Sequence, residues 1–223
     1  MDWEDCEGLA NELLDSCGIP VPVDPWMLAW ALSLEVRTGP ASLKAGCLIG
    51  DRIFVNPRDR LERQGFTVAH ECAHYLCDLE GIPHASQTEH VCDAIASCLL
   101  LPRIDFTRDM RRTGGCLFAL KALHPWASHE ALVRRLVSIM PGVAWVWDCE
   151  TPSGSRRPYS IVTPGQRWPY RRPTRDELDA IDAAIETRAP AESCGGVRAW
   201  PVFEPGFARV ISLASIDVFA DCS

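Results

Sequence analysis

The spacing of apolar residues in the first third of the chain predicts two helices and then short strands. Apolar residues at helical spacing from Leu9 to Leu14 indicate an amphipathic helix that ends near Gly18. Asp24 can cap a second helix that has Pro25 at its first position. Two strand-like segments follow around a Gly-bearing turn, at 35–37 and 45–55.

The middle of the chain carries the strongest helical patterns. Apolar residues recur at helical spacing over 66–79 and over 90–101, and Pro102 ends the second of these helices. Two shorter helices are predicted over 116–123 and 128–139.

Beyond Pro141-Gly142 the pattern changes from helices to strands. Strands are predicted at 143–147, 159–162, 197–203 and 208–213, with a helix over 174–187. This order of strands, helix and strands is typical of a small α+β unit. We therefore expect an α+β protein of two domains: residues 1–140, of which 103–140 are helical, and residues 141–223.

The composition is that of a globular protein with one large domain or one domain and a small appendage. The 223 residues are 47% apolar and 23% charged. No apolar run reaches the roughly 20 residues that span a bilayer, and the acidic start lacks the order of a secretory signal. We expect a soluble, cytoplasmic protein. Its 11 cysteines include no CxxC pair, so most are expected to be small buried residues and not a disulfide framework.

The run His70-Glu71-Cys72-Ala73-His74 carries the candidate chemistry. Two His at i and i+4 lie about 40° apart around a helix and about 6 Å apart along it, so both imidazoles can reach one cation. Glu71 is then placed to act as a general base on water. A chance HExxH match is the alternative. The metzincin pattern fails because Cys77 and Glu80 stand where it requires Gly and His.

A catalytic zinc site needs a third protein ligand. Glu89 follows fifteen residues after His74, and Asp93 lies four residues further, on the same face of the next predicted helix. Glu89 can bind the metal, and Asp93 can accept the far ring N–H of a ligand His. The rival third ligands are His84, in a Gly/Pro-flanked loop, and His90, which would point about 100° away from Glu89.

These motifs resemble the ImmA/IrrE metallopeptidase family. The runs QGFTVAHECAH at 64–74 and EHVCDAIASCLLLP at 89–102 are similar to its usual RFTLAHELGH and E-x-E-A-N-x-F-A-A-x-L-L-M-P. The lead-in segments at 19–24 and 52–56 are also similar, so the resemblance covers about residues 8–140. The departures include Gly65 for Arg, Cys72-Ala73 for Leu-Gly, Asp93 for Asn and Leu101 for Met.

The resemblance implies a zinc endopeptidase with one Zn²⁺ per chain, held by His70, His74 and Glu89 in a gluzincin-like pattern. It implies a mainly helical zincin-like domain with a small sheet, and we expect the C-terminal α+β domain to be regulatory and GAF-like. The implied substrate is a helix-turn-helix repressor protein, whose cleavage releases transcription of a DNA-damage or antiphage (CBASS-type) operon. Glu71 would pass a proton from water to the leaving amine. Manganese is an alternative metal, and the candidates for oxyanion stabilisation are Tyr75, His124 and His129.

Cys116 is a candidate inhibitory metal ligand. It follows Gly114-Gly115 and opens a predicted helix, where a thiolate is stabilised. The arrangement resembles that of some family members in antiphage operons, in which a cysteine thiolate occupies the open zinc position and so inhibits the enzyme. Helix packing is the equally weighted alternative for this side chain.

The net charge of −8 argues against general coating of nucleic acid, but it hides a local pattern. Residues 1–40 hold eight acidic side chains and one Arg, whereas residues 151–175 hold six Arg and no acidic side chain. The candidate nucleic-acid residues are Arg156, Arg157, Arg167, Trp168, Tyr170, Arg171, Arg172 and Arg175. Arg pairs with phosphates and aromatic rings stack on unpaired bases. Certain relatives are activated by single-stranded DNA, which favours this partner over a simple solvated loop.

Two other function classes stay open at this stage. One is a non-catalytic regulatory or toxin–antitoxin binding module with a structural zinc. Glu71 argues against it, because a purely structural site needs no general base. The other is a zinc hydrolase with a non-peptide substrate.

Overall fold

The computed structural model describes residues 3–40, 46–82, 88–149, 159–162, 172–204 and 207–215. Contacts divide the chain into two compact units, one of Met1–Gly114 with Ala119–Ser128 and the other of Gly115–Phe118 with His129–Ser223. The described residues form eight helices and two sheets, which confirms the predicted α+β class. None of these helices is both long and apolar enough to cross a membrane.

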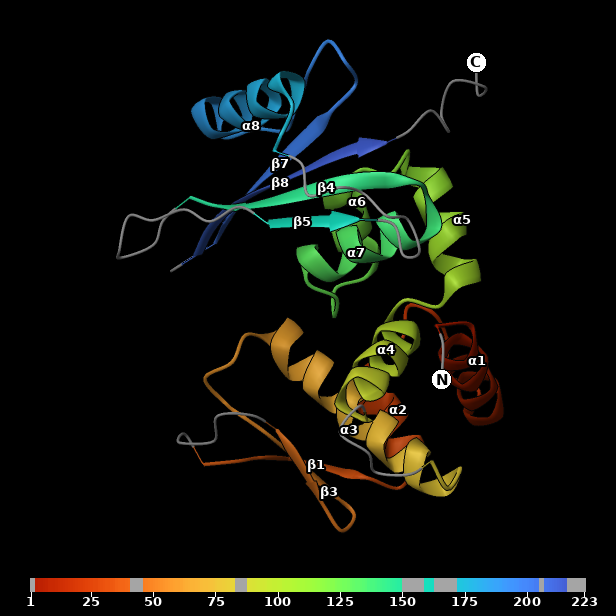
Figure 1. Ribbon diagram of the computed structural model, residues 1–223. Helices are drawn as coiled ribbons and strands as arrows, with labels where there is room; N and C mark the ends of the chain where they lie inside the picture. The colour runs from red at the N-terminus through yellow and green to blue at the C-terminus, as the bar shows by residue number, and fades with distance from the viewer. Residues whose placement is uncertain are drawn as a thin grey trace. The chain divides into compact units, whose positions relative to one another are not determined.

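The first unit is mainly helical, with one small sheet (Figure 1). Its helices are α1 (Trp3–Cys17), α2 (Pro25–Ala31), α3 (Leu61–Leu79), α4 (Thr88–Leu100), α5 (Arg103–Thr113) and most of α6 (Leu117–Leu123). Its strands are β1 (Glu35–Thr38), β2 (Cys47–Ile49) and β3 (Arg52–Val55). Strand β3 lies in the middle, parallel to β1 and antiparallel to β2.

Helices α3 and α4 pack against each other and form the centre of the first core. Val68 and Cys72 of α3 share this core with Ile95 and Leu99 of α4, and all four are fully buried. Burial of each large apolar side chain contributes about 1.5–3 kcal/mol. The predicted apolar spacing therefore produces the rigid helix pair that carries the motif.

The start of α2 confirms the predicted cap. Oδ1 of Asp24 accepts hydrogen bonds from the backbone N–H groups of Trp26, at 2.8 Å, and Met27, at 3.4 Å. Pro25 stands in the first turn, where its missing N–H costs nothing.

Helix α5 lies in the segment 103–140 that was expected to be helical, but it was not predicted as a separate element. Its buried side chains are Phe106, Asp109 and Met110, and the rest of its surface is polar. Gly114 ends the helix in the left-handed conformation with φ of 59°. A helix with so narrow an apolar face gives little periodic signal in the sequence.

The second unit is a five-stranded antiparallel sheet with two helices. Its elements are α7 (His129–Ile139), β4 (Gly142–Asp148), β5 (Tyr159–Val162), α8 (Arg175–Thr187), β6 (Ala191–Glu192), β7 (Arg198–Glu204) and β8 (Phe207–Ser215). The strand order is β5-β4-β8-β7-β6. Helix α8 packs on β7 and β8, and α7 packs on β4 and β5, on the opposite face of the sheet (Figure 1).

The predicted helix over 174–187 is confirmed, and Thr174 caps it. The Thr174 hydroxyl accepts a hydrogen bond from the Glu177 backbone N–H at 3.3 Å. Oε2 of Glu177 in turn accepts one from the Thr174 N–H at 2.6 Å, which completes a capping box. The division into a domain that ends near residue 140 and a GAF-like regulatory domain stays a prediction.

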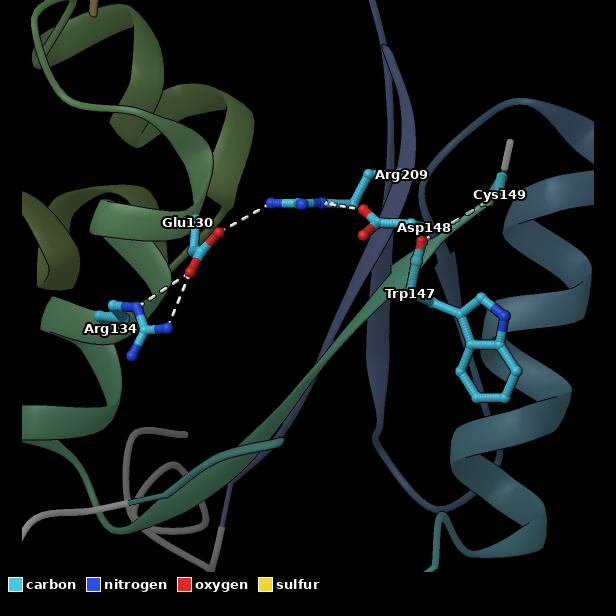
Figure 2. A network of polar contacts seen from close by, with 6 residues as sticks. All are labelled: Glu130, Arg134, Trp147, Asp148, Cys149 and Arg209. Atoms are coloured by element: carbon cyan, nitrogen blue, oxygen red, sulfur yellow. Dashed lines mark hydrogen bonds and ion pairs between the residues drawn. The ribbon is translucent and has the colours of Figure 1, made fainter. Parts of the chain in front are cut away.

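A polar network joins α7 to the sheet of the second unit (Figure 2). Arg209 donates to Asp148 at 2.5 Å and to Glu130 at 2.7 Å, while Arg134 donates to the other oxygen of Glu130 at 2.8 Å. Burial alone would raise the pKa of Glu130, but hydrogen bonds from Tyr159 and Arg134 outweigh it and lower this pKa. Glu130 is therefore held as a carboxylate between two guanidinium groups.

Candidate metal site

Helix α3 presents both motif histidines on one face, as the spacing predicts. The Nε2 atoms of His70 and His74 lie 3.1 Å apart. The two rings have centroids 4.8 Å apart and stand edge to face. Each imidazole is mostly covered, with 15% of the His70 side chain and 20% of the His74 side chain exposed.

Glu89 reaches the same point from the first turn of α4. Its Oε2 lies 3.3 Å from Nε2 of His70, and its Oε1 lies 3.4 Å from Nε2 of His74. Its side chain is 70% exposed, so the group is open to solvent on this side. The packing of α3 on α4 thus brings together residues that are fifteen or more positions apart in the sequence.

The three donors have the spacing that a zinc ion requires. Ligands bound at 2.0–2.1 Å on the corners of a tetrahedron lie about 3.3 Å from one another. The donor separations of 3.1, 3.3 and 3.4 Å match this value. Among the described residues, His70, His74 and Glu89 form the group that is compatible with a metal ion. The separations themselves do not identify the metal.

Asp93 lies beside the far nitrogen of His70. Its Oδ1 is 2.9 Å from the buried Nδ1 of His70, close although not aligned as a hydrogen bond. A carboxylate here favours a proton on Nδ1 and so leaves Nε2 free to bind a cation. The position agrees with the role expected for Asp93, which stays a prediction.

Glu71 is buried beside the donors, with 7% of its surface exposed. Burial raises the pKa of its carboxyl group, and the charge of His74 and a hydrogen bond from the Leu48 backbone offset only part of this effect. A carboxylate with a raised pKa is a better proton acceptor near neutral pH, which suits a general base.

Gly46 allows β2 to approach α3 closely enough for the contact between Leu48 and Glu71. A Cβ atom on Gly46 would lie 2.0 Å from Cγ2 of Thr67 and 3.0 Å from the backbone oxygen of Phe54. No side chain fits there without movement of the Thr67 side chain or of the backbone beside it. This role of Gly46 was not predicted from the sequence, where a glycine before a short strand was the available signal.

Cys92 is a second residue that the sequence analysis did not assign to the site. Its Sγ lies 3.4 Å from Nδ1 of His74, and Cys77 lies behind it with an Sγ–Sγ distance of 3.9 Å. The family pattern has Ala at position 92, so the motif gave no reason to single this residue out.

The other candidates have different surroundings. His90 is exposed on α4, and His84 lies outside the described residues. His124 is 2% exposed and its Nε2 lies 3.2 Å from Asp109, so it cannot contact a substrate. Tyr75 packs partly buried against the core, and His129 lies in the second unit with Nδ1 3.7 Å from Glu204.

Cys116 belongs to the second unit, whereas the three donors belong to the first. It is half-buried before α6, and its inhibitory role stays a prediction. Of the candidate nucleic-acid residues, Arg172 and Arg175 are described and exposed. The others, Arg156, Arg157, Arg167, Trp168, Tyr170 and Arg171, lie outside the described residues.

Together, the helix pair, the small sheet and the three donors form a candidate metal site of the zincin-like class. Residues 35–134 match the family model of the IrrE N-terminal-like domain, Peptidase_M78. This match confirms the resemblance of these residues to the ImmA/IrrE metallopeptidases. No curated protein matched the sequence.

The chain also has the fold of a solved structure, a Mycobacterium tuberculosis transcriptional regulator. The TM-score is 0.63 at 11% sequence identity, and the match covers 94% of this chain and 75% of the other. At this identity the likeness concerns the fold alone.

Proposed function

We propose that this chain is a zinc-dependent endopeptidase that acts on a transcriptional regulator. The observation that carries the proposal is the group of three donors 3.1–3.4 Å apart, with a buried Glu71 beside it. The peptidase family of residues 35–134 supports the same activity.

Each residue of the site would have a separate role in catalysis. His70, His74 and Glu89 would hold the ion, which when bound supplies a Lewis acid and makes water more acidic. The Glu71 carboxylate takes the proton from the attacking water and gives it to the leaving amine. The Leu48 N–H fixes the orientation of this carboxylate through its hydrogen bond.

Strand β2 favours an extended peptide as the substrate. Within the described residues it is an edge strand, hydrogen-bonded to β3 on one side. The N–H of Leu48 points away from β3 to Glu71, so the free edge of β2 faces the site. An extended chain can add to such an edge by backbone hydrogen bonds. This observation favours peptide cleavage over a non-peptide hydrolase.

More specifically, we propose that the substrate is a helix-turn-helix repressor protein and that single-stranded DNA is the activator. This chain shares its fold with a transcriptional regulator, and that likeness is compatible with a role of this chain in transcription. The run of six Arg between 151 and 175 supports an anionic partner. Activation by DNA should weaken steeply as salt increases, because phosphate contacts release counterions.

Glu71→Gln removes the proposed general base and keeps the size of the side chain. Zinc-loaded wild-type protein, with and without single-stranded DNA, is incubated with helix-turn-helix repressors, including one encoded beside it, and cleavage is followed by mass spectrometry. We expect Glu71→Gln to bind zinc but to lose at least 100-fold in cleavage rate, because the Gln amide cannot accept a proton as the carboxylate does.

Glu80→Gln is the matched control, since it makes the same change at an exposed position at the end of α3. It should cleave like the wild type. Cleavage that survives Glu71→Gln would reject the mechanism. Zinc binding without cleavage of any peptide would favour the non-catalytic regulatory module.

A further inference from the structure

The two ligand histidines have different partners behind them. His70 faces the Asp93 carboxylate, which is 53% exposed, across 2.9 Å. His74 faces the buried thiol of Cys92 across 3.4 Å. These partners are successive residues of α4, and each serves one of two histidines a turn apart on α3.

The orientation of the His74 ring is fixed by its neighbours. Its Nε2 faces the donor group, 3.1 Å from His70 and 3.4 Å from Glu89. Nδ1 is therefore the nitrogen that points away from the metal position. When Nε2 binds a cation, the neutral ring carries its proton on Nδ1, and this N–H needs an acceptor.

We propose that the Cys92 sulfur accepts the Nδ1–H of His74, with support from Cys77, and so positions His74 as a metal ligand. This inference rests on the proposed zinc site and names a positioning residue within it. Because the His74 N–H occupies the Cys92 sulfur as a donor, the Cys77 thiol, 3.9 Å away, can donate to the same sulfur. The direction of donation is then from Cys77 and His74 toward Cys92.

The surroundings shield this pair from water. Cys77 and Cys92 are both fully buried, so no solvent molecule competes with the Cys92 sulfur for the His74 N–H. A thiol sulfur accepts a hydrogen bond more weakly than a carboxylate, so Cys92 should hold His74 less tightly than Asp93 holds His70.

The test measures zinc affinity and the His74 ring proton, not only activity. Zinc affinity is determined by competition with a chelator for the wild type and for Cys92→Ala, Cys92→Ser and Cys77→Ala. We expect Cys92→Ala to lose about 10–100-fold in affinity, as for other partners of ligand histidines. Cys92→Ser should restore part of this loss, and Cys77→Ala should cost less than Cys92→Ala.

The spectroscopic readout is the Nδ1–H resonance of His74 in ¹⁵N-histidine-labelled, zinc-loaded protein. It should shift and exchange faster in Cys92→Ala, while that of His70 stays in place. Cys98→Ala is the packing control, because it removes a buried thiol from the same helix six residues further along. If Cys98→Ala weakens zinc binding as much as Cys92→Ala, the effect is packing and the proposal fails.

The outcomes separate this inference from the proposed function. Absence of zinc binding by the wild type would reject the proposed metal site itself. A wild type that binds zinc, together with a Cys92→Ala variant of equal affinity and unchanged His74 resonance, would reject the role of Cys92 alone. If Cys92→Ala does not fold, the Cys92→Ser resonance decides, because an oxygen acceptor must move the Nδ1–H signal.

Discussion

At the residue scale, the site depends on which atoms of each side chain face one another. The i and i+4 spacing of His70 and His74 predicted that both rings would reach one point, and their Nε2 atoms lie 3.1 Å apart. Glu89 could be predicted because its family spacing is characteristic. Cys92 could not, since its contact with His74 depends on how α4 rotates against α3.

His124 gives a residue-scale prediction about pH. Burial lowers its pKa below the ordinary value of 6.5, and the opposite effect of Asp109 offsets this only in part. The unfolded chain therefore binds a proton at His124 more readily than the folded chain. Its contribution to the free energy of unfolding should fall as pH drops from 6.5 toward the folded pKa.

Denaturant unfolding at pH 7.5 and pH 5.5, compared between the wild type and His124→Gln, measures this contribution. Gln cannot titrate but keeps a donor for Asp109, so the variant should lose less stability on acidification. An equal loss in both proteins would assign the acid sensitivity to other groups.

At the scale of elements, the site exists because α3, α4 and β2 approach one another closely. The apolar periodicity predicted both helices, since their core faces are continuous. The bounds of α5 were not predicted, although its segment was expected to be helical, because packing of Phe106 and Met110 stabilises it without a broad apolar face. The close approach of β2 to α3 could not be predicted from the sequence either, because it depends on the lack of a Cβ atom in Gly46.

Gly46→Ala tests this closeness. The added Cβ would lie 2.0 Å from the Thr67 methyl group and 3.0 Å from the Phe54 backbone oxygen, so the Thr67 side chain or the backbone beside it must shift. We expect this shift to weaken the hydrogen bond from the Leu48 N–H to Glu71. We expect a loss of about 1–3 kcal/mol in the free energy of unfolding, as for other overpacked sites. Faster hydrogen exchange of the Leu48 amide should accompany it.

Gly50→Ala is the matched control in the same hairpin. Gly50 has φ of 62° and open space around its Cβ position, so Ala there adds backbone strain of about 1–2 kcal/mol without a clash. Exchange of the Leu48 amide should stay slow in this variant. If both variants expose the amide equally, the close contact at Gly46 is not what holds β2 in place.

At the scale of the whole molecule, the chain consists of two units with separate cores, and the polar network of Figure 2 belongs to the second. The α+β order of that unit could be predicted from alternating strands. The pairing of α7 with the sheet could not, because Arg209 lies 79 residues from its partner Glu130.

Arg209→Met should lower the stability of the second unit by about 1–3 kcal/mol, since two carboxylates lose a charged hydrogen-bond donor. Arg134→Met is the control: its side chain is 55% exposed and pairs with Glu130 at the surface, so its loss should cost less than about 1 kcal/mol. Hydrogen exchange of the β4 and β8 amides measures both. Equal effects of the two substitutions would show that Arg209 does not organise the network.

The three candidate metal donors come from two different helices, so metal binding should affect the amount of this protein in a cell. An ion held by His70, His74 and Glu89 ties α3 to α4, and the unfolded chain offers no such preformed site. At 100 times its dissociation constant, an ion that binds only the folded chain adds about 2.7 kcal/mol of stability. Because cellular proteases remove unfolded chains, the supply of the metal would set the abundance of this protein as well as its activity.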